Sequence, residues 1–273
     1  FEVSVERPQH VRHPIKHQER LAAVFFENEN FIPEVLALRA DFPLVPHLNL
    51  RPFEIPRSLC LYDQDPRDVM LQWTPLSFIE RIRKWLELTA TGDLHAEDQP
   101  LEPLLDASSG TLVVTENVYK LLSEGNQHPL VVYRLTDNET PDLMLIAYTA
   151  DSDPQQKNPP FSAFACITGT ATHGIIRRQP KTVKQLADLV QEFGLDLITE
   201  LRTRLRDLTE NPPANHFYES KPILLLGFPK ARETMAAAEE LEVWAFACSA
   251  TCSETGSSLG LWEVRNGEIG RLI

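Results

Sequence analysis

The chain has 273 residues, of which 42% are hydrophobic, and this is enough for about two domains with buried cores. Its formal net charge of −13 argues against a general nucleic-acid-binding protein, because phosphate recognition depends on clustered Lys and Arg. No apolar run approaches the ~18 residues of a membrane-spanning helix, and the first residues do not resemble a signal peptide. The four cysteines are unevenly placed and suggest no disulfide framework, so a cytoplasmic protein without nucleic-acid or membrane partners is expected.

The first part of the chain predicts an antiparallel meander followed by a helix. Alternating and apolar runs at residues 1–6, 20–27 and 33–43 indicate three short strands joined in series. Residues 45–72 contain four prolines and are expected to be irregular. Long loops inside compact domains often carry function.

A helix is expected over residues 75–92. Thr74 is a suitable N-cap, Pro75 suits the first helical position, and Gly92 suits the C-terminal end. The helix is amphipathic and should pack one face on the sheet. The residues expected on that face are Phe78, Ile79, Ile82, Trp85 and Leu86.

A Pro-rich, acidic stretch follows, and a domain boundary is expected there, giving domains 1–107 and 108–273. Beyond it the pattern predicts a mixed α/β domain with one long helix over residues 182–208, bent near Gly194. Strands are expected at 111–115, 129–135, 142–150, 161–169, 221–228 and 242–248, a short helix at 117–123, and a hairpin with an Asn-Gly turn within 259–273. The expected fold class is α+β.

Cys60 lies in the irregular segment between Leu59 and Leu61. A single cysteine with apolar neighbours is more often a packing residue than a reactive one. Loops on a rigid scaffold, however, often hold catalytic groups. A thiol can also accept an acyl group and pass it on, because thioesters react readily with amines. From the residues alone, Cys60 is a candidate for packing, metal binding or nucleophilic catalysis.

Several features then occur in an order typical of ubiquitin-conjugating enzymes. His47-Leu48-Asn49 stands where that family has His-Pro-Asn, Cys60-Leu61 follows, and Trp73-Thr74-Pro75 corresponds to Trp-Ser-Pro. The amphipathic helix and the sequence EDQPLEPLL at 97–105 complete the series. Over about residues 1–105 the chain resembles the bacterial branch of this family. Its members are fused to, or encoded beside, an adenylating activating enzyme and a ubiquitin-like protein.

The resemblance implies a fold with an antiparallel meander sheet backed by a helix, and a thioester intermediate on Cys60. Cys60 would receive a ubiquitin-like protein from an activating enzyme, or from a fused activating domain, and pass it to an amine on a protein target. It implies that the Asn49 amide steadies the loop or the oxyanion, and that Asp98 stands at the acidic position that orients the amine. ATP would be used by the activating enzyme, so this chain needs no cofactor. The biological setting that the resemblance implies is antiviral defence.

Other residues of the region are expected to have supporting roles. Trp73, Thr74 and Pro75 would fix the loop opposite Cys60. His47 is expected to be a loop histidine bonded to the backbone, and not a general base. The acidic residues after Cys60 are expected to lie in a solvated loop; they are Asp63, Asp65 and Asp68.

Two departures from the family pattern keep an alternative open. Leu48 replaces the usual proline, and the interval from Asn49 to Cys60 is longer, with residues 51–55 as the expected excess. The alternative is a non-catalytic module that docks an activating enzyme or a ubiquitin-like protein. Residues 108–273 are expected to form a docking or linker domain. Since the sequence begins at Phe1 and not Met, it is expected to be a piece of a longer polypeptide.

No metal site is expected. His10, His13 and His17 are close in sequence but lie in a predicted loop without an accompanying cysteine, and Cys248 and Cys252 lack a second pair. The sequence ILLLGFPKARE at 223–233 is expected to be strand, glycine, loop and helix, but it matches neither of the common phosphate-binding glycine motifs.

Overall fold

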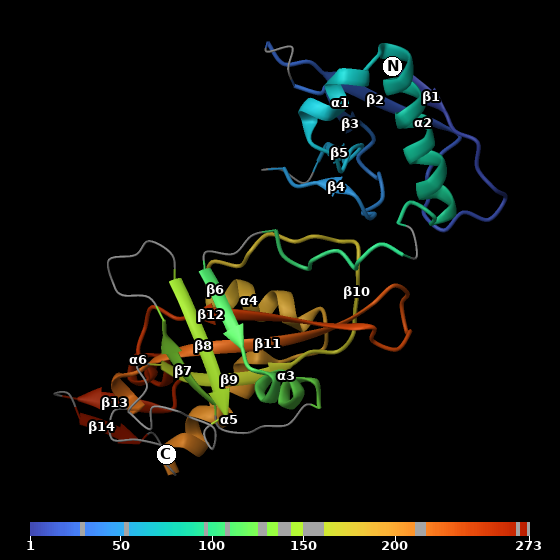
Figure 1. Ribbon diagram of the computed structural model, residues 1–273. Helices are drawn as coiled ribbons and strands as arrows, with labels where there is room; N and C mark the ends of the chain where they lie inside the picture. The colour runs from blue at the N-terminus through green and yellow to red at the C-terminus, as the bar shows by residue number, and fades with distance from the viewer. Residues whose placement is uncertain are drawn as a thin grey trace. The chain divides into compact units, whose positions relative to one another are not determined.

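The computed structural model describes residues 1–27, 31–51, 55–95, 98–106, 110–124, 130–135, 143–149, 161–210, 217–265 and 268–271. The chain divides into two compact units (Figure 1). The first comprises residues 1–106 and 173–178, and the second comprises 107–172 and 179–273. The expected domains 1–107 and 108–273 placed residues 173–178 in the second domain, whereas they belong to the first unit.

The first unit contains a five-stranded antiparallel sheet in the order β1-β2-β3-β5-β4. The strands are β1 (Glu2–Ser4), β2 (Gln18–Val24), β3 (Glu34–Ala37), β4 (Leu48–Asn49) and β5 (Arg57–Leu59). The predicted meander is confirmed by the first three. The prediction that 45–72 is irregular was wrong, because this segment holds β4, β5 and the helix α1 (Pro66–Gln72). Strands of two and three residues are too short to show a periodicity and form here only through pairing.

The predicted helix is confirmed as α2 (Pro75–Thr91). The Thr74 hydroxyl accepts a hydrogen bond from the Ser77 N–H, and the Ser77 side chain binds the Thr74 backbone in return, which forms a capping box. At the other end Gly92 has a left-handed φ of 87°, and its N–H donates to the Leu88 carbonyl. Both ends of α2 are therefore fixed by local sequence.

The buried face of α2 packs on the sheet and forms the core of the first unit. Ile82 and Leu86 are fully buried in a cluster with Leu21 and Val35. The placement of Ile79 on this face was wrong, since its side chain is 43% exposed. Periodicity gives the direction in which a side chain points, whereas burial requires an element opposite it.

The second unit is built on a mixed sheet in the order β10-β11-β9-β7-β8-β6, with β12 paired to β11. Its central pair, β9 and β11, is parallel, while β7 is antiparallel to both β8 and β9. The strands are β6 (Gly110–Val114), β7 (Leu130–Arg134), β8 (Leu143–Thr149), β9 (Phe161–Ile167), β10 (Ala171–Thr172), β11 (Lys221–Ala231) and β12 (Glu240–Ala247). The predicted C-terminal hairpin is confirmed as β13 (Trp262–Arg265) and β14 (Glu268–Arg271), with its Asn-Gly turn outside the described residues.

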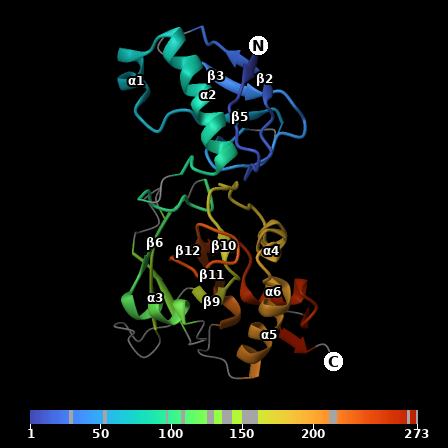
Figure 2. The same ribbon diagram turned by 90° about the vertical axis from the view of Figure 1, so that its right-hand side faces the viewer.

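Helices cover both faces of this mixed sheet. Figure 2 shows α3 (Glu116–Ser123) on one face, where Val118 and Leu122 pack with Ile223 and Leu225 of β11. The other face carries α4 (Val183–Gln191), α5 (Leu197–Glu210) and α6 (Cys252–Ser258), and a 3₁₀ helix, η2 (Phe217–Glu219), precedes β11.

The long helix predicted for residues 182–208 was wrong, because the chain forms α4 and α5 with a break between them. At the break Gly194 has a φ of 78°, a left-handed conformation that ends a helix instead of bending it. The short helix α6 was not predicted, although Thr251 and Glu254 form a capping box that is visible in the sequence. None of the helices in the described part of the chain is long and apolar enough to cross a membrane.

Two leucines of α2 allow a matched test of this packing. We expect Leu86→Ala to lower the free energy of unfolding by about 2–5 kcal/mol, because it opens a cavity in the core, and Leu76→Ala to lower it by about 0.5 kcal/mol or less. Leu86 is fully buried and Leu76 is 68% exposed on the same helix. Urea denaturation followed by tryptophan fluorescence measures both, and equal losses would contradict the packing described.

Candidate functional site

The position of Cys60 is set by the short hairpin of β4 and β5. Leu48 pairs with Leu59, and Asn49 pairs with Ser58. The next backbone bond in this ladder runs from the Cys60 N–H to the His47 carbonyl at 2.9 Å. The predicted excess, residues 51–55, falls between these two strands, and 52–54 lie outside the described residues. After the longer interval between Asn49 and Cys60, the chain therefore lies beside His47 again.

Cys60 is half-buried and lines a pocket of about 210 Å³ in the first unit. Its thiol donates to the Tyr62 carbonyl, with Sγ 3.7 Å from the oxygen. We call this cavity the Cys60 pocket; it is lined by His47, Cys60, Leu61, Tyr62, Asp63, Arg81, Lys84, Trp85, Leu88, Leu94 and Gln99. The buried side chains of Leu59 and Leu61 flank the cysteine without enclosing it. The sulfur thus faces a cavity and is not part of the core.

The pKa of the Cys60 thiol is raised above its ordinary value, first by burial and then by the negative charges of Glu102 and Asp63. The backbone contact with Tyr62 acts in the opposite direction and does not offset them. The thiol is therefore the dominant form at neutral pH. A reaction that needs the thiolate would have to remove this proton as the sulfur attacks.

The side chain of Asn49 connects the two strands of the hairpin. Its amide nitrogen donates to the Ser58 hydroxyl and to the Leu59 carbonyl, both at 3.0 Å. Asn49 does not line the Cys60 pocket. Of the two roles that the sequence left open, this geometry matches that of steadying the loop, because both amide contacts hold the backbone beside Cys60.

The Trp73-Thr74-Pro75 sequence forms the junction between α1 and α2. Trp73 ends α1, Thr74 caps α2, and Pro75 occupies its first position. The Trp73 ring packs on Phe78 at a centroid distance of 5.7 Å. None of the three lines the Cys60 pocket, so they hold the start of α2.

Arg81 of α2 is the residue that holds the chain after Cys60. Its Nε donates to the Leu61 carbonyl at 2.8 Å, and its guanidinium lies 5.2 Å from the centre of the Tyr62 ring. This role of Arg81 was not predicted from the sequence. The only sequence signal was an arginine on the polar side of α2, which is also the pattern of a solvated side chain.

The acidic residues lie differently from the expectation. Asp98 is exposed and does not line the Cys60 pocket, whereas Glu102 and Asp63 are the carboxylates that act on the Cys60 thiol. Asp65 lies exposed in the loop before α1, and its carboxylate accepts from the Arg67 N–H at 2.8 Å and caps that helix. The expectation of a loop was wrong for Asp68. Asp68 lies in the first turn of the same helix.

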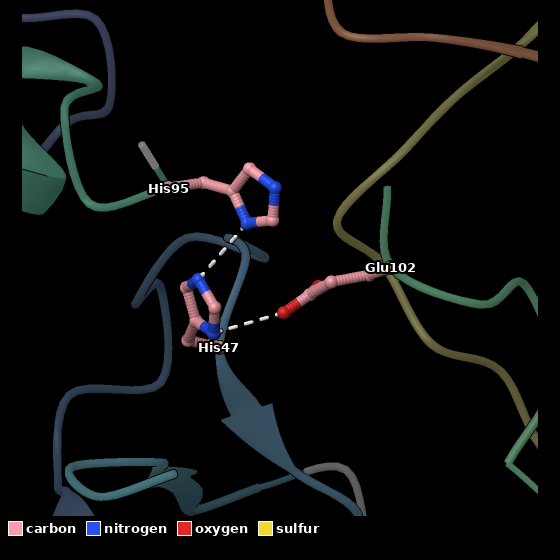
Figure 3. A group of neighbouring side chains, drawn as sticks. All are labelled: His47, His95 and Glu102. Atoms are coloured by element: carbon pink, nitrogen blue, oxygen red, sulfur yellow. Dashed lines mark hydrogen bonds and ion pairs between the residues drawn. The ribbon is translucent and has the colours of Figure 1, made fainter. Parts of the chain in front are cut away.

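His47 belongs to a side-chain cluster and is not bonded to the backbone alone. Its Nδ1 lies 2.8 Å from Glu102 Oε1, and its Nε2 lies 3.3 Å from His95 Nδ1 (Figure 3). One potential ligand atom from each of His47, His95 and Glu102 lies within 4.8 Å of the others, so the group could hold a metal ion. Neither His95 nor Glu102 was singled out in the sequence, since they are far from His47 along the chain.

The second unit contains a larger cavity, of about 790 Å³. Its lining combines apolar residues such as Leu112 and Phe246 with polar and charged ones such as Lys181, Thr182 and Glu242. Burial raises the pKa of Cys248 to about 11, which keeps this thiol protonated.

The expectation of a loop and helix after Gly227 was wrong, because β11 continues to Ala231. Lys230 is buried in this strand, with its Nζ 2.8 Å from a Glu242 carboxylate oxygen. Lys230 is thus part of the paired sheet.

Comparison with known proteins gives one family match. Residues 1–120 match the family described as prokaryotic E2 family A, so the match covers the first sheet, α1 and α2 and extends into α3. No curated protein matches the chain. The matched region holds the whole series from His47 to EDQPLEPLL that led to the resemblance. By this match, residues 1–120 are similar to a bacterial E2-like family, which supports a role related to ubiquitin-like protein conjugation.

Proposed function

We propose that Cys60 carries a ubiquitin-like protein as a thioester and transfers it to an amine on a protein target. In the first step the Cys60 sulfur attacks the thioester on the activating enzyme, the thiolate of that enzyme leaves, and the proton lost from the Cys60 thiol protonates the leaving thiolate. In the second step the amine attacks the thioester carbonyl, the Cys60 thiolate leaves, and a proton is lost from the amine. Thioester exchange is nearly balanced in free energy, so positioning matters more than activation.

The observation that carries this proposal is the setting of the sulfur. Cys60 is half-buried at a pocket. It is fixed by the hydrogen bond from its own N–H to the His47 carbonyl and by the Arg81 contact with the carbonyl of the next residue, Leu61. A packing cysteine would have lain in the apolar cluster with its neighbours Leu59 and Leu61. ATP is consumed by the activating enzyme or a fused activating domain, and residues 108–273 serve as a docking or linker module. A cytoplasmic location follows from this role.

Two observations favour a second candidate, a non-catalytic docking module. The raised pKa of Cys60 disfavours the thiolate, and both amide contacts of Asn49 are made inside the hairpin. In that case the first unit would bind an activating enzyme or a ubiquitin-like protein without accepting an acyl group. The following experiments separate the two candidates.

Adduct formation is the direct test. Incubation of the full chain with ATP and the activating enzyme and ubiquitin-like protein encoded nearby should give an adduct that reducing agent removes. Cys60→Ala should form none, and Cys60→Ser should form at most a slower, reducing-agent-resistant ester. Cys248→Ser, which changes a half-buried cysteine of the second unit, should behave as wild type. Binding of the partners without any adduct would instead establish the docking module.

The reactivity of Cys60 should depend on pH in a specific direction. Since the pKa of its thiol is raised, alkylation by iodoacetamide in buffer with EDTA should still be increasing above pH 9, the ordinary value for a cysteine. Asp63→Asn removes one of the charges that raise this pKa and should increase the rate at neutral pH. Asp98→Asn is the control and should leave the rate unchanged. Mass spectrometry of the Cys60 peptide measures the rate of alkylation. A rate that reaches a plateau below pH 9 would contradict the raised pKa of Cys60.

Asn49→Ala should distinguish a positioning role from an oxyanion role. If Asn49 only holds the hairpin, both the loading of Cys60 and the discharge of a preformed thioester to lysine should decrease. A direct oxyanion donor would lower discharge alone, by about 10²–10³. Ser58→Ala, which removes one of the two acceptors of the Asn49 amide, should show the same joint effect more weakly. Single-turnover gel assays measure the two steps, and loss of discharge alone would refute the positioning role.

A further inference from the structure

We infer that His47, His95 and Glu102 form a binding site for a divalent transition-metal ion, with Zn²⁺ as the best-suited ion. The three side chains come from separate segments: the residue before β4, the stretch after α2, and the Pro-rich segment before residue 106. Each offers one ligand atom within 4.8 Å of the other two. This site was not expected from the sequence, and its binding of an ion can be measured without the proposed thioester chemistry.

The types of ligand indicate which metal would bind. Two imidazoles and one carboxylate are a set that zinc uses, whereas Ca²⁺ and Mg²⁺ prefer oxygen ligands throughout. Three protein ligands also leave the fourth position of a tetrahedral zinc for water or another ligand. The group thus has the composition of an accessible zinc site, and not that of a closed structural one.

The geometry of the two imidazoles is close to what zinc requires. Two nitrogens that bind one zinc at 2.0–2.1 Å in tetrahedral geometry lie about 3.3 Å apart. His47 Nε2 and His95 Nδ1 are separated by 3.3 Å. The same distance fits a hydrogen bond between a protonated and an unprotonated nitrogen, and the experiment below separates these two cases.

Glu102 completes the site as its charged member. Its Oε1 lies 2.8 Å from His47 Nδ1, while His47 Nε2 faces His95 (Figure 3). Glu102 would therefore bind an ion held by Nε2 after its carboxylate turns from Nδ1 toward the ion. The side chains of His47 and Glu102 are 24% and 13% exposed, so an ion has a path from solvent and is only partly screened.

The backbone around the cluster holds the ligands in place before any ion binds. His47 has a φ of 56°, and its carbonyl accepts the Cys60 N–H. On the Glu102 side, the Arg177 N–H donates to the Leu104 carbonyl at 2.7 Å, and the Asp106 N–H donates to Arg177. An ion would therefore join three segments, of which those with His47 and Glu102 are already fixed by backbone hydrogen bonds, and this limits the entropy lost on binding.

Histidines that are close together in the sequence are not the ones that form this site. His10, His13 and His17 are close in sequence, but the group found among the described residues does not include them. The pKa of His13 is lowered by burial and by the neighbouring Arg12 charge, an environment that also disfavours a cation. His173 lies with its ring centroid 4.4 Å from that of His95 but is outside the group of three.

Zinc titration of the purified full chain tests the inference without any partner or ATP. Competition between the protein and a chromophoric chelator, in a phosphine reductant, should show one Zn²⁺ bound per chain. His95→Gln and Glu102→Gln should each weaken binding by at least about tenfold, the effect seen even for groups behind a ligand. Control variants should keep the wild-type affinity; they are His10→Gln, an exposed histidine elsewhere in the first unit, and Cys60→Ser.

Cobalt provides a second measurement that does not depend on the variants folding. Co²⁺ in the wild-type chain should give the visible absorption of a four- or five-coordinate site with nitrogen and oxygen ligands, and no thiolate charge-transfer band. Absence of stoichiometric zinc binding would overturn the inference. So would a thiolate band, or affinity that survives both His95→Gln and Glu102→Gln. Because no conjugation step is measured, failure here leaves the proposed function untouched, and failure of adduct formation leaves the metal site untouched.

Discussion

The antiparallel pairing of β4 with β5 is the constraint on which the site depends. It joins only two residues to two, Leu48 with Leu59 and Asn49 with Ser58. Such a short ladder needs further support, which comes from the Cys60 N–H bond to His47 and the Asn49 amide bond to the Leu59 carbonyl. Because these contacts bracket the cysteine, the residues that define the family motif act first as structure. Their spacing along the chain matters less than their register across the hairpin.

The negative charges around Cys60 have two opposite effects: they disfavour the Cys60 thiolate, and they favour a cation nearby. Glu102 and Asp63 raise the pKa of the thiol and so keep it protonated. The same negative charges favour an approaching ammonium or a metal cation. Glu102 therefore connects the thioester site with the histidine cluster, since it acts on the sulfur electrostatically and contacts His47 directly. An ion bound at this cluster would offset a charge that otherwise opposes the thiolate.

Arg81 shows how α2 serves both stability and function. One side of the helix supplies Ile82 and Leu86 to the core, which fixes the helix on the sheet. Arg81, next to Ile82 in sequence, then reaches the Leu61 carbonyl and the Tyr62 ring. The chain after Cys60 is thus held by a helix whose position is determined by its apolar side. Loss of packing in the core would displace the pocket as well.

The sequence by itself determined the elements whose signals are local. The meander, the caps of α2 at Thr74 and Gly92, the closing hairpin and the order of motifs around Cys60 all follow from neighbouring residues, because periodicity and capping act within a few positions. Only the tertiary structure decided features that join distant segments: the β4–β5 pairing, the exposure of Ile79, the charges that reach Cys60 and the meeting of His47, His95 and Glu102. These depend on which element lies opposite a residue, and one sequence does not contain that information in any local pattern.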